Sequence, residues 1–339
     1  MKQIQRIPTH VEFGKSALSA QLLDGHRAVI VHGASPASLA GLDAVGATQG
    51  VIEARALGSV QDVCDLAGSL DPQDVDMIVG IGGGAVIDKA KKLGGVLRDA
   101  GAQIGIVATP TLPGSGVEAS KAVVINEDRK IIEASDSFLP DQVIYDYRLI
   151  AQAGLGRLLD GAYDAAVQGL ESLFSAFANP VSTAMAHGAL GKFHQITTVL
   201  SAGADLSDRA LLKLVPEFCS LSFAGGLAQS EAGAGPIHAM AHSVETTFGG
   251  GHARLVRAIA RRAITQYVEA ARTAHEAAVL AMLADDFAAL TALEAADVQP
   301  ILSAAPTDIF LERMRADPCW RTSKVRFRDA EVHDILSGA

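Results

Sequence analysis

Three polar residues lie on one face of a predicted helix in the segment YDAAVQGLESLF, residues 163–174. Asp164, Gln168 and Glu171 are spaced i, i+4 and i+7, which places their side chains on one helical stripe. A single polar stripe on an otherwise apolar helix is typical of a helix that faces a site, although many such stripes are only solvated. If this site binds a divalent ion, an amide is an unexpected ligand, because it is weaker than imidazole.

Histidines in a second apolar segment could act together with this stripe. His238 and His242, in IHAMAHSVETTFGGGH, are spaced i, i+4 and share a helical face. The glycines that follow let the chain return, which brings His252 near. Imidazole and carboxylate groups can form a set that holds Fe(II) or Zn(II). A histidine in an alanine-rich helix is, however, also often a core residue, so both interpretations stay open at this point.

A glycine-rich turn in VGIGGGAVIDKAK separates an apolar strand from a helix. Gly83 and Gly84 let the backbone approach a phosphate there, and the start of the helix offers free N–H groups. The spacing is neither GxGxxG nor that of a Walker loop, so a purely structural turn is the alternative. Asp88, which follows early in the helix, either caps it or binds a ribose hydroxyl.

A second glycine-rich turn, in ATPTLPGSGVEAS, also follows a predicted strand. It carries the short hydroxyl side chains of Thr109, Thr111, Ser115 and Ser120. Two such turns at adjacent strand ends form a cradle of the size of a pyrophosphate. We therefore expect a dinucleotide site at the carboxyl edge of a sheet.

The elements that position these turns alternate in type. The predicted strands are 27–33, 51–57, 75–84, 103–111, 121–126 and 142–146. Between them lie predicted helices at 59–70, with Ser59 as N-cap, and at 85–100. Such alternation predicts a parallel sheet with both faces covered.

Only helical patterns follow from about residue 150. The predicted helices are 155–175, 181–202, 207–229, 233–247, 252–283 and 286–295. The fold class is therefore an α/β N-terminal dinucleotide-binding domain, residues 1–150, plus an all-α C-terminal domain, residues 151–339, that carries the metal and substrate groups. A cleft between two such domains is a favoured place for a ligand.

Composition excludes several functional classes. The net charge of -10 argues against a nucleic-acid partner. No run of 18 or more apolar residues is present, so we expect no membrane partner. The three cysteines, Cys64, Cys219 and Cys319, lack metal-binding spacing and are expected to be free thiols in a reducing compartment. We expect a cytoplasmic protein.

Four motifs, in the right order between residues 82 and 252, resemble those of group III, iron-type alcohol dehydrogenases. GGGAVIDKAK is similar to GGGSxxDxAK, PTLPGSGVE to PTTAGTGSE, DAAVQGLES to DALTHAIES, and IHAMAHSVETTFGGGH to HAMAHxxGxxxxxPHG. The wider superfamily includes glycerol dehydrogenase and dehydroquinate synthase. The resemblance implies hydride transfer in the cleft between a dinucleotide-binding domain and a helical domain.

The resemblance also implies a set of cofactor-binding residues for NADP or NAD. Gly83, Gly84 and Ala85 would hold the pyrophosphate, and Lys130 matches a lysine that contacts the cofactor ribose. The other residues expected at the cofactor are Gly33, Asp88, Thr109, Thr111, Leu112 and Ser115.

Gly33 occupies a position where the family often has an aspartate that binds the adenosine ribose and selects NAD. Loss of that carboxylate removes repulsion against a 2′-phosphate, which admits NADP. No arginine follows closely in the sequence to bind the phosphate.

The family's ion is held by an aspartate and three histidines. Asp164, His238 and His252 match three of these positions, and Gln168 replaces the remaining histidine. The resemblance assigns His242 to the nicotinamide and substrate side, where it or His238 would act in catalysis. A divalent ion, Fe or Zn, is one expectation. The alternative is a metal-free relative, as maleylacetate reductases are usually regarded, in which these side chains orient the substrate.

The function expected from the resemblance is that of an NAD(P)-dependent oxidoreductase, an alcohol dehydrogenase or aldehyde reductase. Its substrate is expected to be small and anionic, either phosphonoacetaldehyde-like or sugar-acid-like, and the protein is expected to be a homodimer. A cyclase or lyase of the dehydroquinate-synthase kind, which uses NAD transiently, is the main alternative, but its dense basic motifs are absent. A non-catalytic binding protein is a third, although both glycine turns are intact.

Overall fold

The computed structural model describes residues 7–46, 50–127, 130–203, 208–290, 298–305 and 307–338. A six-stranded sheet in the order β1-β8-β5-β4-β2-β3 forms the first part of the chain, and all its neighbouring strands are parallel. The strands are β1 (His10–Gly14), β2 (Ala28–His32), β3 (Val51–Glu53), β4 (Met77–Gly82), β5 (Gly105–Pro110) and β8 (Gln142–Asp146). The predicted parallel sheet is confirmed, and β1 is an edge strand that the sequence did not predict.

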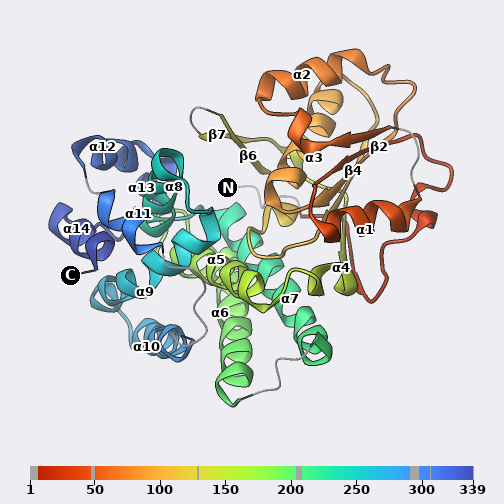
Figure 1. Cartoon of the computed structure of the whole chain (residues 1–339). Helices are drawn as coiled ribbons and strands as arrows, with labels where there is room; N and C mark the ends of the chain where they lie inside the picture. Colours follow the sequence, from red (N-terminus) through yellow and green to blue (C-terminus); the bar gives the residue numbers. More distant parts are fainter. Residues whose placement is uncertain are drawn as a thin grey trace.

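Helices cover both faces of this sheet (Figure 1). They are α1 (Pro36–Val45), α2 (Val60–Ser69), α3 (Gly84–Asp99) and α4 (Tyr147–Ala151), with short 3-10 helices η1 (Ala20–Leu23), η2 (Ala54–Ala56), η3 (Val117–Ala119) and η4 (Asp136–Phe138). One apolar core joins α2 and α3 to the sheet, and a separate core joins α1 and α4 to its other face. Because the strands are parallel, the residues that follow β2, β4 and β5 meet at one edge.

The remaining strands form an antiparallel ribbon outside the main sheet. β6 (Ala122–Asn126), which the sequence predicted, pairs with β7 (Lys130–Ala134), which it did not. Lys91 of α3 is fully buried, and its Nζ donates to the carbonyl oxygens of Val117, at 2.7 Å, and Ala122, at 2.5 Å. These bonds fix the ribbon to the glycine-rich part of the sheet.

The second part of the chain is helical (Figure 1). Its helices are α5 (Leu155–Leu173), α6 (Pro180–Ser201), α7 (Asp208–Ala232), α8 (Pro236–Phe248), α9 (His252–Ala270), α10 (Ala274–Ala289), α11 (Gln299–Ala304), α12 (Asp308–Ala316), α13 (Pro318–Thr322) and α14 (Asp329–Ser337). α5 is buried from Leu158 to Ser172 and lies at the centre of this part. The predicted combination of an α/β part and an all-α part is confirmed.

Two element predictions were wrong. The predicted helix 252–283 is two helices, because α9 ends at Ala270 and Thr273 caps the start of α10 in a capping box with Glu276. The predicted strand 51–57 ends at Glu53 and continues as the 3-10 helix η2. The end of the predicted helix 286–295 lies outside the described residues.

One helical stretch in the described residues, Leu211–Ala232 of α7, is long and apolar enough to cross a membrane by length and composition alone. Within the structure 56% of its most apolar window is buried, which is also expected for a core helix.

Candidate functional site

The first glycine turn lies where β4 passes into α3. Every residue of β4 is buried, and Gly83 is the extended N-cap residue of α3. On one side, the Gly33 N–H donates to the Ile81 carbonyl at 3.1 Å, and on the other the Thr111 N–H donates to the Gly82 carbonyl at 2.9 Å. The ends of β2, β4 and β5 are therefore held together beside the N-terminus of a helix, which favours an anion.

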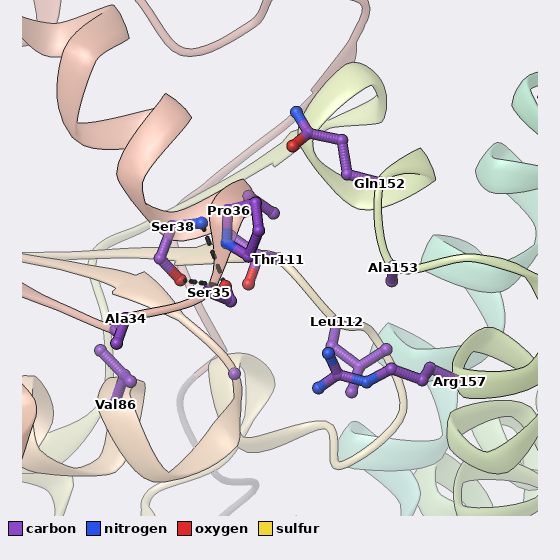
Figure 2. A pocket seen from close by; sticks show the side chains of 13 residues that line it. Ala34, Ser35, Pro36, Ser38, Val86, Thr111, Leu112, Gln152, Ala153 and Arg157 are labelled. Atoms are coloured by element: carbon purple, nitrogen blue, oxygen red, sulfur yellow. Dashed lines mark hydrogen bonds between the residues drawn. The ribbon is translucent and has the colours of Figure 1, made fainter.

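A cavity of about 220 Å³, the first cavity, opens at this edge. Figure 2 shows it between the start of α1 and the start of α5, with the Arg157 side chain extending from α5 toward Leu112. Ser35 caps α1 by accepting a bond from the Ser38 N–H at 3.2 Å. Of the residues expected at the cofactor, those that line this cavity are Gly33, Gly83, Thr111 and Leu112.

The second glycine turn joins the sheet to the helical part. A Cβ added at Gly114 would lie 2.3 Å from the Gly161 Cα of α5, and one added at Gly116 would lie 2.3 Å from the Gly226 Cα of α7. Both turn glycines also have a positive φ, 149° and 64°. Only glycine allows the turn to approach the two helices so closely.

Ser115 and Gln168 connect this turn to both halves of the candidate site. A Cβ added at Gly84 would lie 2.8 Å from the Ser115 hydroxyl oxygen, so the two glycine turns are in contact. The Gln168 side-chain amide donates to the Ser115 carbonyl at 2.8 Å. Its own oxygen, Oε1, is buried without a hydrogen-bond partner among the described residues.

Asp164, His238 and His252 converge one turn away from Gln168. His238 Nε2 is 3.1 Å, and His252 Nε2 is 3.7 Å, from Asp164 Oδ1. One ligand atom from each of the three residues lies within 4.8 Å of the others. The predicted grouping of a carboxylate with two imidazoles is therefore present in the geometry.

Glu171 holds His238 in place from the other side. Its Oε2 atom lies 2.6 Å from His238 Nδ1. The same carboxylate accepts hydrogen bonds from the Gly235 and Ile237 N–H groups and from the Tyr267 hydroxyl. Burial disfavours the charged imidazole, but the bonds with Asp164 and Glu171 outweigh it and raise the pKa of His238 to about 10.

His242 has a different partner, Asp317, at the start of α13. His242 Nδ1 lies 3.0 Å from Asp317 Oδ2, and Asp317 Oδ1 accepts the Cys319 N–H at 2.8 Å. Burial lowers the pKa of His242, the Lys130 charge adds to the effect, and Asp317 opposes it. His242, Asp317 and Cys319 also bring ligand atoms within 4.8 Å of one another.

Lys130 reaches the histidines from the ribbon. Its Nζ lies 2.6 Å from Glu245 Oε2 of α8, and Glu245 Oε2 lies 3.7 Å from His252 Nδ1. Burial, and then the nearby Lys130 charge, lower the pKa of His252 well below its usual value. The lysine expected at the cofactor ribose thus ends beside the histidine cluster.

Three further residues expected at the cofactor do not line the first cavity. Asp88 is buried, with its carboxylate 3.5 Å from Lys91 Nζ, so it faces the interior. Thr109 is also fully buried, and its hydroxyl has no hydrogen-bond partner among the described residues. Ala85 lines a separate cavity next to Gly33.

Residues 8–147 match the profile of a family described as iron-containing alcohol dehydrogenases. This match covers the α/β part of the chain.

Curated relatives are similar over part of their length. The 1-propanol dehydrogenase PduQ of Citrobacter freundii is 30% identical over 178 residues, which cover 51% of this chain and 46% of the relative. The corresponding protein of Salmonella typhimurium is 29% identical over 240 residues, 66% of this chain and 62% of the relative. The match thus spans less than two thirds of either relative.

Solved structures are similar along the whole chain. Sulfoacetaldehyde reductase from Bifidobacterium kashiwanohense, in complex with NAD+, has a TM-score of 0.80 at 18% identity and covers 100% of both chains. Maleylacetate reductase from Agrobacterium tumefaciens has a TM-score of 0.75 at 20% identity, with 99% of this chain and 97% of that chain covered. At this level of identity the likeness concerns the fold.

The donors that converge at this site fit a divalent ion. Two imidazoles and a carboxylate suit Fe(II) or Zn(II). Because Glu171 engages Nδ1 of His238, its Nε2 faces Asp164, which is how a carboxylate orients a ligating histidine. The Gln168 side-chain oxygen is a buried polar atom with no hydrogen-bond partner in the part of the chain that the structure describes, so it could face an ion.

Two functional candidates were missed in the sequence. Glu245 had a signal, because it follows His238 and His242 at i+7 and i+3 on the same helix face. Asp317 had none, since it lies 75 residues from His242 and only the fold of α13 against α8 brings it near.

Proposed function

We propose that this protein is an NAD(P)-dependent oxidoreductase that interconverts an alcohol and an aldehyde or ketone. The observation that carries the proposal is the bond from the Gln168 amide to the Ser115 carbonyl. It places the glycine turns suited to a dinucleotide beside the helix that carries Asp164. Hydride transfer needs the cofactor and the polarising groups to be adjacent in this way.

Each part of the site has a role in this reaction. The first cavity binds the cofactor, with its pyrophosphate at Gly83 and Gly84. Asp317 engages Nδ1 of His242, so Nε2 is left to take up or deliver the proton of the substrate oxygen. The lowered pKa of His242 keeps this imidazole neutral, and therefore able to accept a proton, near neutral pH.

Asp164, His238 and His252 would hold a divalent ion, with Gln168 as the candidate fourth ligand. When bound, such an ion supplies Lewis-acid polarisation of the substrate oxygen. Replacement of a histidine by Gln168 lowers the affinity expected for Fe or Zn. Glu171 compensates in part, because it orients His238 and increases its basicity.

The proposed substrate is small and anionic, of the phosphonoacetaldehyde-like or sugar-acid-like kind. Lys130 supplies a positive charge beside His242 and His252. The structurally similar sulfoacetaldehyde reductase is named for an anionic aldehyde. The boundary near residue 150, the cytoplasmic location and the homodimer stay predictions.

Absorbance of reduced nicotinamide tests the proposal. The purified protein is supplied with NADPH or NADH and a panel of anionic and neutral aldehydes, before and after chelation with metal analysis. Turnover of an aldehyde supports the oxidoreductase, and failure to bind either cofactor contradicts it. Gln168→His should raise iron or zinc content, with Gln195→His on the exposed face of α6 as the control.

A metal-free reductase is the second candidate, favoured by Gln168 and by the direct bond between His238 and Asp164. In that mechanism a protonated His238, held between Asp164 and Glu171, supplies a positive charge near the substrate oxygen. Activity that survives complete removal of metal would favour it, whereas activity that returns only with added iron or zinc would favour the ion.

A further inference from the structure

A second cavity, of about 200 Å³, lies next to the first at the end of β3. Both cavities are lined by Gly33, Ala34 and Val86. A ligand that extends along the first cavity past Gly83 therefore reaches the second one around Gly33. Hydride transfer requires the nicotinamide to lie beside the histidine cluster, so the opposite end of the cofactor, with the adenosine ribose, would extend toward the second cavity.

Two cations line the second cavity, Arg55 of η2 and Lys89 of α3. The Arg55 side chain is 82% exposed, and its Nε lies 3.3 Å from Glu53 Oε1. Lys89 Nζ donates to the Ala54 carbonyl at 2.9 Å, which keeps the ammonium at the cavity wall. No arginine follows Gly33 closely along the chain, but the pairing of β2 with β3 brings Arg55 to the same edge of the sheet.

We infer that Gly33, Arg55 and Lys89 form a subsite for the 2′-phosphate of NADP(H), so that the chain prefers NADP(H) to NAD(H). This inference rests on the proposed function. The planar fork of a guanidinium matches a phosphate, and an ammonium adds a compact charge. The residue after β2 supplies no carboxylate that would repel a phosphate.

Space and charge both suit this ligand. Gly33 has no side chain, and an added Cβ would meet the Ser38 hydroxyl at 3.0 Å and the Val86 Cγ2 at 3.2 Å. Glu53 is the acidic residue of the lining, and its charge is opposed by Arg55. Partial burial disfavours the charge of Lys89 and lowers its pKa, so an incoming phosphate dianion compensates for lost solvation.

Binding of NADPH and NADH to the full-length protein tests the subsite. Fluorescence titrations use the wild type, Arg55→Ala, Lys89→Met, the double variant, and Lys15→Ala as a control on an exposed lysine outside both cavities. We expect the wild type to bind NADPH at least about 10-fold more tightly than NADH. Each single variant should lower the affinity for NADPH about 10-fold. The affinity for NADH should stay within about twofold of the wild type, because NADH has no phosphate at this position.

Adenosine 2′,5′-bisphosphate and AMP provide the same comparison without nicotinamide. The bisphosphate should compete with NADPH more strongly than AMP, and the double variant should abolish this difference. If the variants lose equal affinity for NADPH and NADH, or if the wild type prefers NADH, the proposed subsite is wrong. The proposed oxidoreductase function would still stand. Binding of neither dinucleotide would overturn both the subsite and the proposed function.

Discussion

The glycine turns and the histidine cluster meet at Gln168, yet they are built by different means. At the turns, the missing side chains matter, because Gly114 and Gly116 bring the backbone against α5 and α7. At the cluster, side chains matter, and each histidine is oriented by a carboxylate from another segment. Substitutions in the first region should therefore alter packing and stability, whereas those in the second should alter chemistry and leave the fold intact.

The largest expected effect tests the packing side of this comparison. In Gly161→Ala, the new Cβ would lie 2.2 Å from the Pro113 carbonyl oxygen, which belongs to the second turn. We expect the free energy of unfolding to fall by about 3 kcal/mol, since the contact is with backbone that cannot rotate away. Urea unfolding provides the measurement.

Gly188→Ala is the matched control, in α6. A Cβ there would meet nothing within 4 Å, so the better helix propensity of alanine should stabilise the protein by about 1 kcal/mol or less. Similar losses in both variants would show that the close approach of the turn to α5 contributes nothing specific.

The second effect tests the chemical side. Asp317→Asn removes the charge that faces Nδ1 of His242. We expect kcat to fall about 100-fold with little change in stability or cofactor affinity, because the imidazole loses its orienting carboxylate. Asp308→Asn, an exposed residue of α12, is the control.

The pH profile separates this role from a structural one. Asp317 raises the pKa of His242, so its removal should lower that pKa further. A base must be neutral, and activity is lost as the pH falls through its pKa. The acid limb of kcat should therefore move to lower pH in Asp317→Asn, and an unmoved limb would exclude His242 as the titrating base.

The two regions also differ in how far the sequence predicted them. The motif around Gly83 correctly predicted a glycine turn between a strand and a helix, because local composition determines that geometry. The role that we propose for Arg55 could not be predicted from the sequence, since it depends on the strand order β4-β2-β3. Spacing likewise predicted the shared face of His238 and His242, but not the residues from distant helices that orient them.

The position of Lys130 also depends on the fold, and the sequence alone did not predict it. The resemblance placed it at the cofactor ribose, and the structure places its Nζ beside Glu245. Its position depends on the pairing of β6 with β7, and β7 has no clear strand signal of its own. The break between α9 and α10 was missed, although Thr273 and Glu276 have the spacing of a capping box and could have indicated it.

The third expected effect is on the pH dependence of stability, and it comes from Asp88 in α3, the helix that follows the first glycine turn. Burial raises the pKa of Asp88 to about 6, although Lys91 opposes the shift. The folded state therefore binds a proton that the unfolded state releases, and stability falls as the pH rises from about 4 to about 6. Asp88→Asn should remove roughly 2 kcal/mol of this pH dependence, measured by urea unfolding at several pH values.

Asp99→Asn, at the exposed end of the same helix, controls for the change in net charge. It should leave the slope of stability against pH between 4 and 6 as in the wild type. A steep slope that persists in Asp88→Asn would assign the proton uptake to another group.

The smallest expected effect concerns Glu53, the acidic residue that lines the second cavity. Its carboxylate is 45% exposed and lies 3.3 Å from Arg55 Nε, so it both repels a phosphate and holds the guanidinium. We expect Glu53→Gln to raise NADPH affinity about threefold, because removal of a partly screened charge contributes only about 0.6 kcal/mol. The gain should shrink at high salt, where such charges are screened, and Glu269→Gln should show none. A loss of NADPH affinity would instead mean that Glu53 mainly positions Arg55, and that the second cavity relies on an oriented side chain as the histidine cluster does.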